Sequence, residues 1–429
     1  MTILRFFLSI AITLVASTAW CGTRSALNPM RMAAMRVLNS SRNPQLVATL
    51  PNMEVYENNN GGFAIVAGNA TSPKVLAYSP SGSFQQAADN PGFSWWLKAV
   101  GNATLKETPK PDTTRFAPFI APLITSKWGQ NEPCRYMCPF LEYNPDLSKY
   151  GIYIPDSTHN AVGCGPAAMA QLMYYYKYPQ HGTGSASVVV KYDQANVTLN
   201  VDFESAAYDW QNMLDDYSGT YSTANGMAVA QLCYHAAVAA KANWTRLGGA
   251  TFDEDILNAM INHFNYNDSA RFIPRPLYQD QEWMDMLYTM LNNGQPVLYS
   301  GKDINFQVGI LVGHNFIIDG YDEQGLVHVN WGWHGSQDGY FDIATLTTGI
   351  LSFDDWQGMY VDLYPEVQTI AGDVNGDGLV NVMDVTAVIN HILGDTPTHF
   401  NSQAADMNND NSINVIDVTA IINHILTGL

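Results

Sequence analysis

The chain has 429 residues, 47% of them hydrophobic, with 23 Tyr and 10 Trp, so it is long enough for two or three domains with sizeable cores. Its formal net charge of −19 argues against nucleic acid and anionic membrane surfaces as partners. Part of this acidic excess is local, because residues 373–429 hold seven Asp and no Glu, Lys or Arg.

Residues 1–22 are typical of an export signal. A basic residue precedes a short apolar run, and Ser17 and Ala19 form the small-x-small pattern at which such signals are cut. The apolar run is too short to span a bilayer comfortably, and no later stretch looks like a membrane span. Cys21 raises the alternative of a lipid anchor, but Trp20 is too large for the usual attachment motif. We expect a secreted protein, extracellular or associated with the cell surface.

Residues 23–115 form the first predicted unit, which has α+β character. Turn residues separate short apolar runs that predict strands at 52–57, 61–68 and 74–79. A helix is expected at 93–100. The following stretch, 106–115, is polar and contains two prolines, so we expect an exposed connection that proteases can cut.

Residues 116–364 are the largest predicted unit. Helical patterns come early, at 164–178, 224–241, 253–264 and 280–293. Strand patterns come late, at 296–300, 313–320, 326–331, 339–343 and 359–363. Helices followed by a sheet predict an α+β fold.

Cys164 is the strongest candidate for a nucleophile. It lies between two glycines and is followed by Pro166 and a run of good helix formers. Glycine permits a tight loop and proline favours the first helical turn, so Cys164 is expected at the N-terminus of a buried helix. The helix dipole and unpaired N–H groups there favour the thiolate, which is the nucleophilic form. The alternative is a small buried cysteine at a helix start.

Two later stretches and one earlier one supply partners for Cys164. His314 is predicted at the start of a buried strand, and a hairpin through the turn 322–325 would bring Asn330 beside it. Cysteine, histidine and asparagine in this chain order form the papain-like arrangement. Gln130 precedes the cysteine, and its side-chain N–H could stabilise an oxyanion.

Each of these residues also has a structural explanation. His314 could be a hydrogen-bonded core histidine and Asn330 a turn residue. His328 and His334 are expected to be packing or surface residues.

The remaining cysteines point to no metal site. Cys134 and Cys138 are close enough to form a disulfide in a turn, and the sequence leaves open whether they do. Zinc is disfavoured because no second ligand pair of suitable spacing accompanies them. Cys233 lies in an apolar, helix-like run and is predicted to be a core residue.

A repeat with a period of 33 residues occupies 373–429. Each copy has oxygen-bearing side chains at the first, third, fifth, ninth and twelfth loop positions, and a backbone carbonyl serves the seventh. This is EF-hand-like calcium spacing, with Asp in place of the usual Glu at the last position. The predicted ligands are Asp373, Asn375, Asp377, Leu379, Asn381 and Asp384, and then Asp406, Asn408, Asp410, Ser412, Asn414 and Asp417.

A helix is expected after each calcium loop. In the first copy its predicted apolar face consists of Val385, Val388, Ile389, Ile392 and Leu393.

On these motifs, residues from about 25 to 364 resemble the streptopain family of secreted bacterial cysteine proteases. The matching motifs are Trp-Gly-Gln at 128–130, Gly-Cys at 163–164 with the helix after it, Gly-His at 313–314, and His-Val-Asn-Trp-Gly-Trp at 328–333. The resemblance implies a papain-like fold in which Cys164 is the nucleophile, His314 the general base and Gln130 the oxyanion donor. It also implies that Asn330 orients the histidine, that Trp331 packs over the His–Asn pair, and that 23–115 is an inhibitory prodomain.

Residues 373–429 resemble a type I dockerin, joined by a short linker at 365–372. The resemblance implies a small all-α module whose folding depends on two structural Ca²⁺ ions. It also implies that this module binds a cohesin domain on another protein. Val385-Thr386 and Val418-Thr419 occupy the places where dockerins carry partner-recognition residues.

The sequence thus predicts a secreted zymogen of a cysteine endopeptidase that acts on protein or peptide substrates without a catalytic cofactor. Its expected partners are its own prodomain and a cohesin-bearing scaffold or surface protein. Two alternatives stay open: a catalytically silent binding module, and another acyl transfer through a thioester, such as transglutamination. Peptide specificity, the exact cleavage sites and the oligomeric state do not follow from the sequence.

Overall fold

The computed structural model describes residues 28–39, 44–50, 52–69, 72–85, 90–102, 107–141, 159–193, 195–245, 248–305, 310–343, 356–365, 371–376, 379–397, 400–408, 410 and 412–427. The predicted signal at 1–22 and most of the predicted linker lie outside these residues. The chain divides into two compact units, Met1–Tyr364 and Pro365–Leu429. We call residues 28–102 the N-terminal part of the first unit and residues 107–364 its central part.

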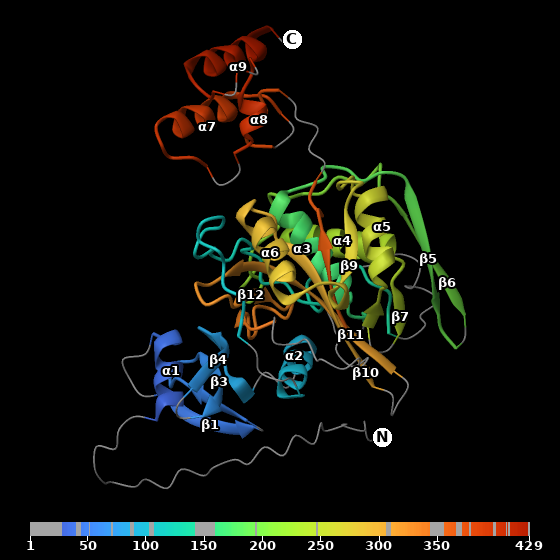
Figure 1. The fold of residues 1–429 in the computed structure, drawn as a ribbon. Helices are drawn as coiled ribbons and strands as arrows, with labels where there is room; N and C mark the ends of the chain where they lie inside the picture. The colour runs from blue at the N-terminus through green and yellow to red at the C-terminus, as the bar shows by residue number, and fades with distance from the viewer. Residues whose placement is uncertain are drawn as a thin grey trace. The chain divides into compact units, whose positions relative to one another are not determined.

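The N-terminal part is a helix and a four-stranded antiparallel meander followed by a second helix (Figure 1). Asn28 caps the first helix by accepting a hydrogen bond from the Met30 N–H, and Pro29 occupies its first turn, which is a common helix start. The elements are α1 (Pro29–Val37), β1 (Gln45–Leu50), β2 (Met53–Glu57), β3 (Phe63–Asn69), β4 (Ser72–Ser79) and α2 (Pro91–Asn102).

The central part begins with helices and a hairpin and ends with strands, which confirms the α+β expectation. Its helices are α3 (Cys164–Tyr176), α4 (Thr223–Ala239), α5 (Asp253–Asn262), η2 (Arg275–Leu277) and α6 (Asp280–Asn292). Its strands are β5 (Ser185–Lys191), β6 (Asn196–Asp202), β7 (Asn243–Thr245), β8 (Gly248–Ala250), β9 (Arg271–Pro274), β10 (Val297–Asn305), β11 (Ile310–Tyr321), β12 (Val327–Asn330), β13 (Gly339–Phe341) and β14 (Trp356–Val361).

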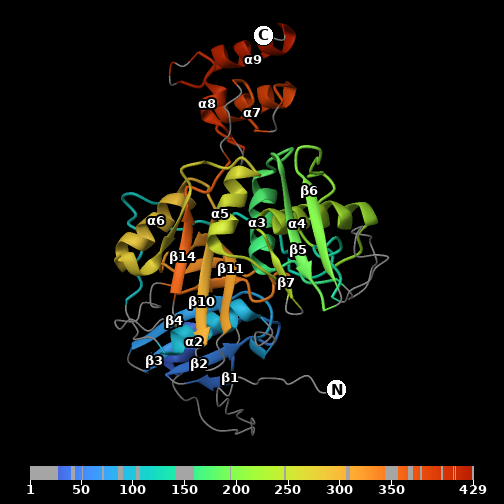
Figure 2. The same cartoon turned by 90° about the vertical axis from the view of Figure 1, so that its right-hand side faces the viewer.

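One sheet runs through both parts of the first unit. Among the described residues, ten strands are ordered β1-β2-β3-β4-β13-β12-β11-β10-β14-β9, and β4 pairs with β13 at the junction between the parts. Figure 2 shows β10, β11 and β14 side by side, with α3 and α4 on one side of them and α6 on the other.

Two hydrophobic cores cover the two faces of the sheet in the central part, and a smaller third one packs α1 on β2 and β3 of the N-terminal part. Successive side chains of a strand point to opposite faces, and on β11 Ile317 belongs to one core whereas Phe316 and Ile318 belong to the other. The first core contains α3, α4 and α5. The second contains α2 and α6 and joins side chains of the N-terminal part, such as Trp96, to side chains of the central part, such as Phe341.

Several elements were not predicted from the sequence. These are α1, β1, the β5–β6 hairpin, the short β7–β8 pair, β9, the 3-10 helix η2 and the short helix α8 (Ser402–Ala405). In the hairpin the apolar residues of β6 alternate with polar ones, so that only one face is buried. The expected order of helices first and strands later is therefore incomplete.

The C-terminal unit contains α7 (Val382–Ile392), α8 (Ser402–Ala405) and α9 (Val415–Thr427). A helix follows each repeat loop, as expected. The predicted apolar face is only partly right: Val388 is buried, whereas Leu393 is 77% exposed and Ile389 and Ile392 are about two-fifths exposed. The reason is the narrow contact between α7 and α9, which buries a single stripe of each helix.

Candidate active site and calcium loops

Cys164 is the first residue of α3, as the sequence predicts. The preceding Gly163 has φ of +100°, and a Cβ on it would lie 1.9 Å from the Gly249 carbonyl oxygen, so only glycine fits there. Nearly all side chains after Cys164 in this helix are buried, which fixes the position of the thiol.

The thiol of Cys164 faces Asn315 and not the predicted histidine. Its Sγ lies 3.9 Å from Asn315 Oδ1, and Asn315 Nδ2 donates to Asp253 Oδ1 over 3.3 Å. Burial raises the pKa of the Cys164 thiol, and the backbone N–H groups of Asn315 and Gly165 only partly oppose the rise. The helix start therefore lowers the pKa of the thiol as expected, but in this state burial outweighs that effect.

His314 lies on the opposite face of β11 from Cys164. It shares that face with Phe316, whereas its neighbour Asn315 points toward α3. His314 Nε2 lies 2.8 Å from the Trp331 carbonyl oxygen, and because a carbonyl only accepts, Nε2 carries the proton. Burial lowers the pKa of His314 to about 4, although the bond to Trp331 counteracts it. The structure thus does not bring His314 and Cys164 together.

Helix α2 of the N-terminal part holds His314 in this position. A Cβ on Gly92 would lie 2.3 Å from His314 Cδ2 and 2.6 Å from Trp331 Cε3, so the helix backbone rests directly on both rings. Asn90 sets where the helix begins, because its Oδ1 accepts from the Phe93 N–H while its Nδ2 donates to the Ser336 carbonyl. The histidine is therefore enclosed between α2 and the loop that follows Trp331.

Asn330 is on the predicted hairpin but not beside His314. The hairpin pairs it with Ile317, and its side chain lies on the α3 side of the sheet. Its Nδ2 donates to the Ser126 carbonyl over 2.8 Å, and its Oδ1 accepts from Gln171 Nε2 over 3.2 Å. In this state Asn330 joins the central part's N-terminal loop to α3 and does not orient the histidine.

Gln130 and Trp331 both lie next to the site. The Gln130 carbonyl accepts from the Val162 N–H over 3.0 Å, two residues before the cysteine. Trp331 is fully buried, and its ring centroid is 6.4 Å from that of His314. Its backbone N–H donates to Asp338 Oδ1 over 2.9 Å.

The other two histidines have structural partners. His328 Nδ1 contacts Asp319 Oδ1 at 2.6 Å, and this ion pair raises its pKa although burial alone would lower it. His334 packs its ring against the backbone of Gly129. Both histidines are therefore packing residues, as expected.

The four described cysteines, Cys134, Cys138, Cys164 and Cys233, are free thiols. Cys134 and Cys138 are buried in the first core together with Cys233, so the expected core position of Cys233 is right.

Asn315, Asp253, Gln171 and Gly92 were not predicted to lie at the site. Asn315 follows His314 directly, so strand alternation could have flagged it as the residue on the other face. The roles of Asp253 and Gln171 depend on how α5 and α3 pack, and no local pattern marks them. Gly92 is distant in sequence, and its contact with His314 depends on the docking of a whole helix.

In each repeat loop of the C-terminal unit, the last aspartate accepts hydrogen bonds from backbone N–H groups of that loop. Asp384 accepts from the N–H groups of Val374 and Asn381, both over 2.8 Å. Asp417 repeats the pattern with the N–H groups of Met407 and Asn414, both over 2.9 Å. Both aspartates are fully buried, so each loop turns its last carboxylate inward.

The oxygen-only set of side chains in these loops fits Ca²⁺. Within the described part of the chain, no three His, Cys, Asp or Glu side chains are close enough to hold an ion. Asp377 of the first loop lies outside that part.

Comparisons with known families agree with this architecture. The Peptidase C10 family matches residues 128–341, the Spi protease inhibitor family matches residues 26–104, and the Dockerin type I domain matches residues 371–426. Among the described residues, none of the helices combines the length and the apolar character that a membrane span needs.

Individual relatives point the same way. Streptopain of Streptococcus pyogenes is 31% identical over 334 residues, which cover 73% of this chain and 81% of the relative. The thiol protease/hemagglutinin PrtT of Porphyromonas gingivalis is 28% identical over 312 residues, which cover 70% of this chain and 34% of the relative.

Two solved structures from Prevotella intermedia are also similar. A mutant fragment of prointerpain A has a TM-score of 0.64 and 32% identity, and the match covers 75% of this chain and 99% of that one. Active wild-type interpain A has a TM-score of 0.52 and 33% identity, covering 60% of this chain and 100% of that one. Fold and comparisons together define a papain-like cysteine peptidase preceded by an inhibitor-like segment. The chain belongs to the Peptidase C10, or streptopain, family and carries a type I dockerin, which is a calcium-binding module.

The buried, neutral His314 makes the stability of this state depend on pH. Folding lowers the pKa of His314 from 6.5 to about 4, so its contribution to stability is present above pH 6.5 and is lost as pH falls through about 4. The gap between the two pKa values corresponds to about 3 kcal/mol.

In a Cys164→Ala background, His314→Gln keeps an N–H donor for Trp331 but cannot titrate. We expect denaturant titrations between pH 7 and about 4 to show a shallower loss of unfolding free energy for this variant. His235, whose pKa burial also lowers to about 4, contributes equally to both proteins. Identical pH slopes would show that His314 is not buried in the neutral form.

Proposed function

We propose that this protein is a secreted cysteine endopeptidase made as a zymogen and tethered to a cohesin-bearing partner through its dockerin. The observation that carries the proposal is the position of His314, which α2 holds on the far side of β11 from Cys164. Because the N-terminal part keeps the histidine away from the cysteine, the uncut peptidase would be inactive. The match of that part to a protease inhibitor family supports an inhibitory role for residues 23–115.

Removal of α2 would free His314, and a change in the twist or register of β11 would then bring it to Cys164. The His314 ring is enclosed by Gly92 of α2 and by the loop after Trp331. Asn90 joins this loop to α2 through a hydrogen bond to the Ser336 carbonyl. Without α2, a charged imidazole can leave the apolar face and meet the thiol near Asn315. The resulting thiolate–imidazolium pair is the reactive form of cysteine peptidases.

The proposed reaction is acyl transfer through Cys164. The sulfur attacks the carbonyl carbon of the scissile bond, and the oxyanion is met by N–H groups at the start of α3 and by the Gln130 side chain. His314 first takes the thiol proton and then gives it to the leaving amine, which yields a thioester. Water, deprotonated by His314, hydrolyses the thioester and restores the thiol. Asn330 would orient the imidazole once His314 occupies this position.

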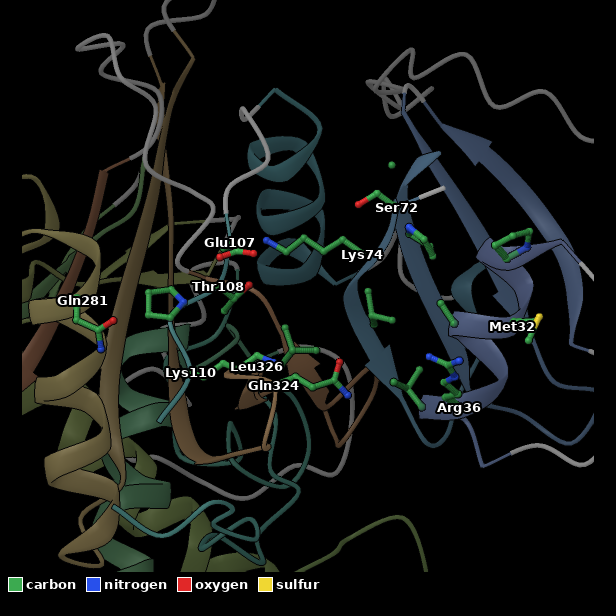
Figure 3. A pocket seen from close by; sticks show the side chains of 17 residues that line it. Met32, Arg36, Ser72, Lys74, Glu107, Thr108, Lys110, Gln281, Gln324 and Leu326 are labelled. Carbon is green, nitrogen blue, oxygen red and sulfur yellow. The ribbon is translucent and has the colours of Figure 1, made fainter. Parts of the chain in front are cut away.

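The connection between the two parts is anchored at its C-terminal side. Residues Glu107–Lys110 line a cleft of about 1190 Å³ between α1, β4 and the central part (Figure 3). Thr108 Oγ1 donates to Asp342 Oδ2 over 2.7 Å, and the Pro109 carbonyl accepts from the Tyr288 hydroxyl over 2.7 Å. A peptidase needs an extended segment, so within the cleavable connection expected at 106–115 we propose a cut next to Glu107, before these anchors.

The dockerin is the proposed attachment module. We propose one Ca²⁺ in each loop, bound by the oxygen ligands named for the two repeats. Apolar side chains at equivalent positions of α7 and α9 stay exposed, among them Met383 (63%) and Ile416 (60%). Together with Thr386 and Thr419 they would form the surface for a cohesin.

The first test concerns the nucleophile and base. Cys164→Ala and His314→Ala should each lower casein hydrolysis by about 10³-fold or more, because the groups act as one unit. Asn330→Ala should keep partial activity, and His181→Ala, on the exposed surface, should match the wild type. Precursor bearing Cys164→Ala should accumulate uncut on a gel. Retained proteolysis in Cys164→Ala would rule out the assignment.

The second test concerns the contact that displaces His314. Gly92→Ala places a methyl group against His314 and Trp331, so α2 must move away and the precursor should process itself at least about fivefold faster. Gly101→Ala on the same helix is a matched control, because a Cβ there meets only Met53 Cε at 3.6 Å. N-terminal sequencing over time measures the cut and its position. Equal processing rates for the two folded variants would contradict the proposed inhibition.

The third test concerns calcium. A chelator should unfold residues 373–429, because the clustered loop carboxylates repel one another without the ion. Circular dichroism of the 365–429 segment measures this. Asp384→Ala should weaken calcium-dependent folding, whereas Asp395→Ala removes the same charge outside both loops and should not. A spectrum that the chelator leaves unchanged would overturn the calcium assignment.

A further inference from the structure

Strand β13 lies at the edge that the N-terminal part covers. In the described residues it is the strand of the central part that pairs with β4, through Tyr340 with Tyr78 and Phe341 with Ala77. The Asp342 N–H extends the ladder by donating to the Leu76 carbonyl over 2.8 Å. Removal of the N-terminal part would leave these backbone groups as an open edge, which is a template for another extended chain.

Near the same edge, two acidic side chains of the central part contact side chains of β4. One contacts a basic residue and the other an aromatic residue. Asp342, fully buried, contacts Lys74 Nζ at 2.7 Å. Four residues later in β4, Tyr78 stacks on Tyr340 at 4.9 Å and 15°, and its hydroxyl donates to Asp322 Oδ2 over 3.2 Å. Figure 3 shows Lys74 reaching from the N-terminal part toward Glu107 and Thr108. The edge therefore recognises side chains as well as backbone.

We propose that, after processing, the β13 edge is a second substrate-binding site that takes an extended protein segment with a basic residue followed four positions later by an aromatic one. The segment would add to the sheet antiparallel to β13, in the place that β4 holds in the precursor. This inference rests on the proposed function, because the edge opens only when the N-terminal part leaves.

Charge favours such a segment over a second copy of the peptidase. Two β13 edges pairing with each other would place two acidic edges side by side, each with its Asp342 carboxylate and no basic partner for it, and like charges that are close across a strand pair are destabilising. A segment with a basic residue would instead make the contact with Asp342 that Lys74 makes in the precursor. The added strand would lie about 14 Å from β11, three strand spacings away, so a few extended residues suffice to reach the Cys164 site.

Direct binding tests the edge without any catalysis. A fluorescent peptide of residues 72–80 is titrated into Cys164→Ala protein, cut at a protease site engineered before Glu107 and freed of its N-terminal part. The peptide should bind this cut protein and not the uncut precursor, whose edge β4 occupies. Peptides with Lys74→Glu or Tyr78→Ser should bind at least about tenfold more weakly. No binding, or equal binding by the Lys74→Glu peptide, overturns the inference, as does self-association of the cut protein in light scattering.

Kinetics then tests whether the edge serves substrates. With processed wild-type enzyme, the 72–80 peptide should inhibit casein cleavage but not hydrolysis of a fluorogenic dipeptide amide. Asp342→Asn should lower the ratio of kcat/KM for casein to that for the amide by about tenfold. Asp362→Asn, at the opposite end of the sheet, should leave this ratio unchanged. Equal inhibition of both substrates, or an unchanged ratio in Asp342→Asn, overturns the inference. If wild-type enzyme cleaves neither substrate, the proposed function fails, and the binding result still decides on the edge.

Discussion

The arrangement of the whole first unit depends on the alternation of side chains along β11. His314 and Asn315 are adjacent, so they point to opposite faces of the sheet, and α3 brings Cys164 to the face of Asn315. A strand cannot offer both residues to the same partner without a change in its twist or register. The other features of the site, from the Trp331 carbonyl to the position of α2, maintain this separation.

Polar groups at the junction between the two parts are satisfied from both sides. The Asp342 carboxylate takes up Lys74 of the N-terminal part and Thr108 of the connection, while its backbone carbonyl accepts from Trp96 Nε1 over 2.9 Å. Breaking a buried pair by removing one partner is costly, because the other charge is left uncompensated. The junction is therefore held by specific polar contacts as well as by apolar burial.

Much of the fold could be predicted because its signals are local. Glycine, cysteine and proline in succession indicated the start of α3, and the turn at 322–325 indicated the hairpin of β11 and β12. The start of α1 also had a local signal, Asn28 followed by Pro29, and so did β6, whose apolar residues alternate; neither was recognised. Alternation places His314 and Asn315 on opposite faces, but which of the two meets α3 could not be predicted, because it depends on how α3 packs on the sheet. The Asn330 contacts with Gln171 and Ser126 likewise depend on packing between segments far apart in the chain.

The second core has a consequence for how long the processed protein can persist. That core joins Trp96 and Phe93 of the N-terminal part to Phe341 and Trp331 of the central part, so the peptidase acquires its native packing as part of a larger body. If the proposed cut takes place, a processed molecule that unfolds would lack the segment that completes this core in the precursor. Its lifetime would then be governed by the height of its unfolding barrier and not by an equilibrium with the unfolded chain.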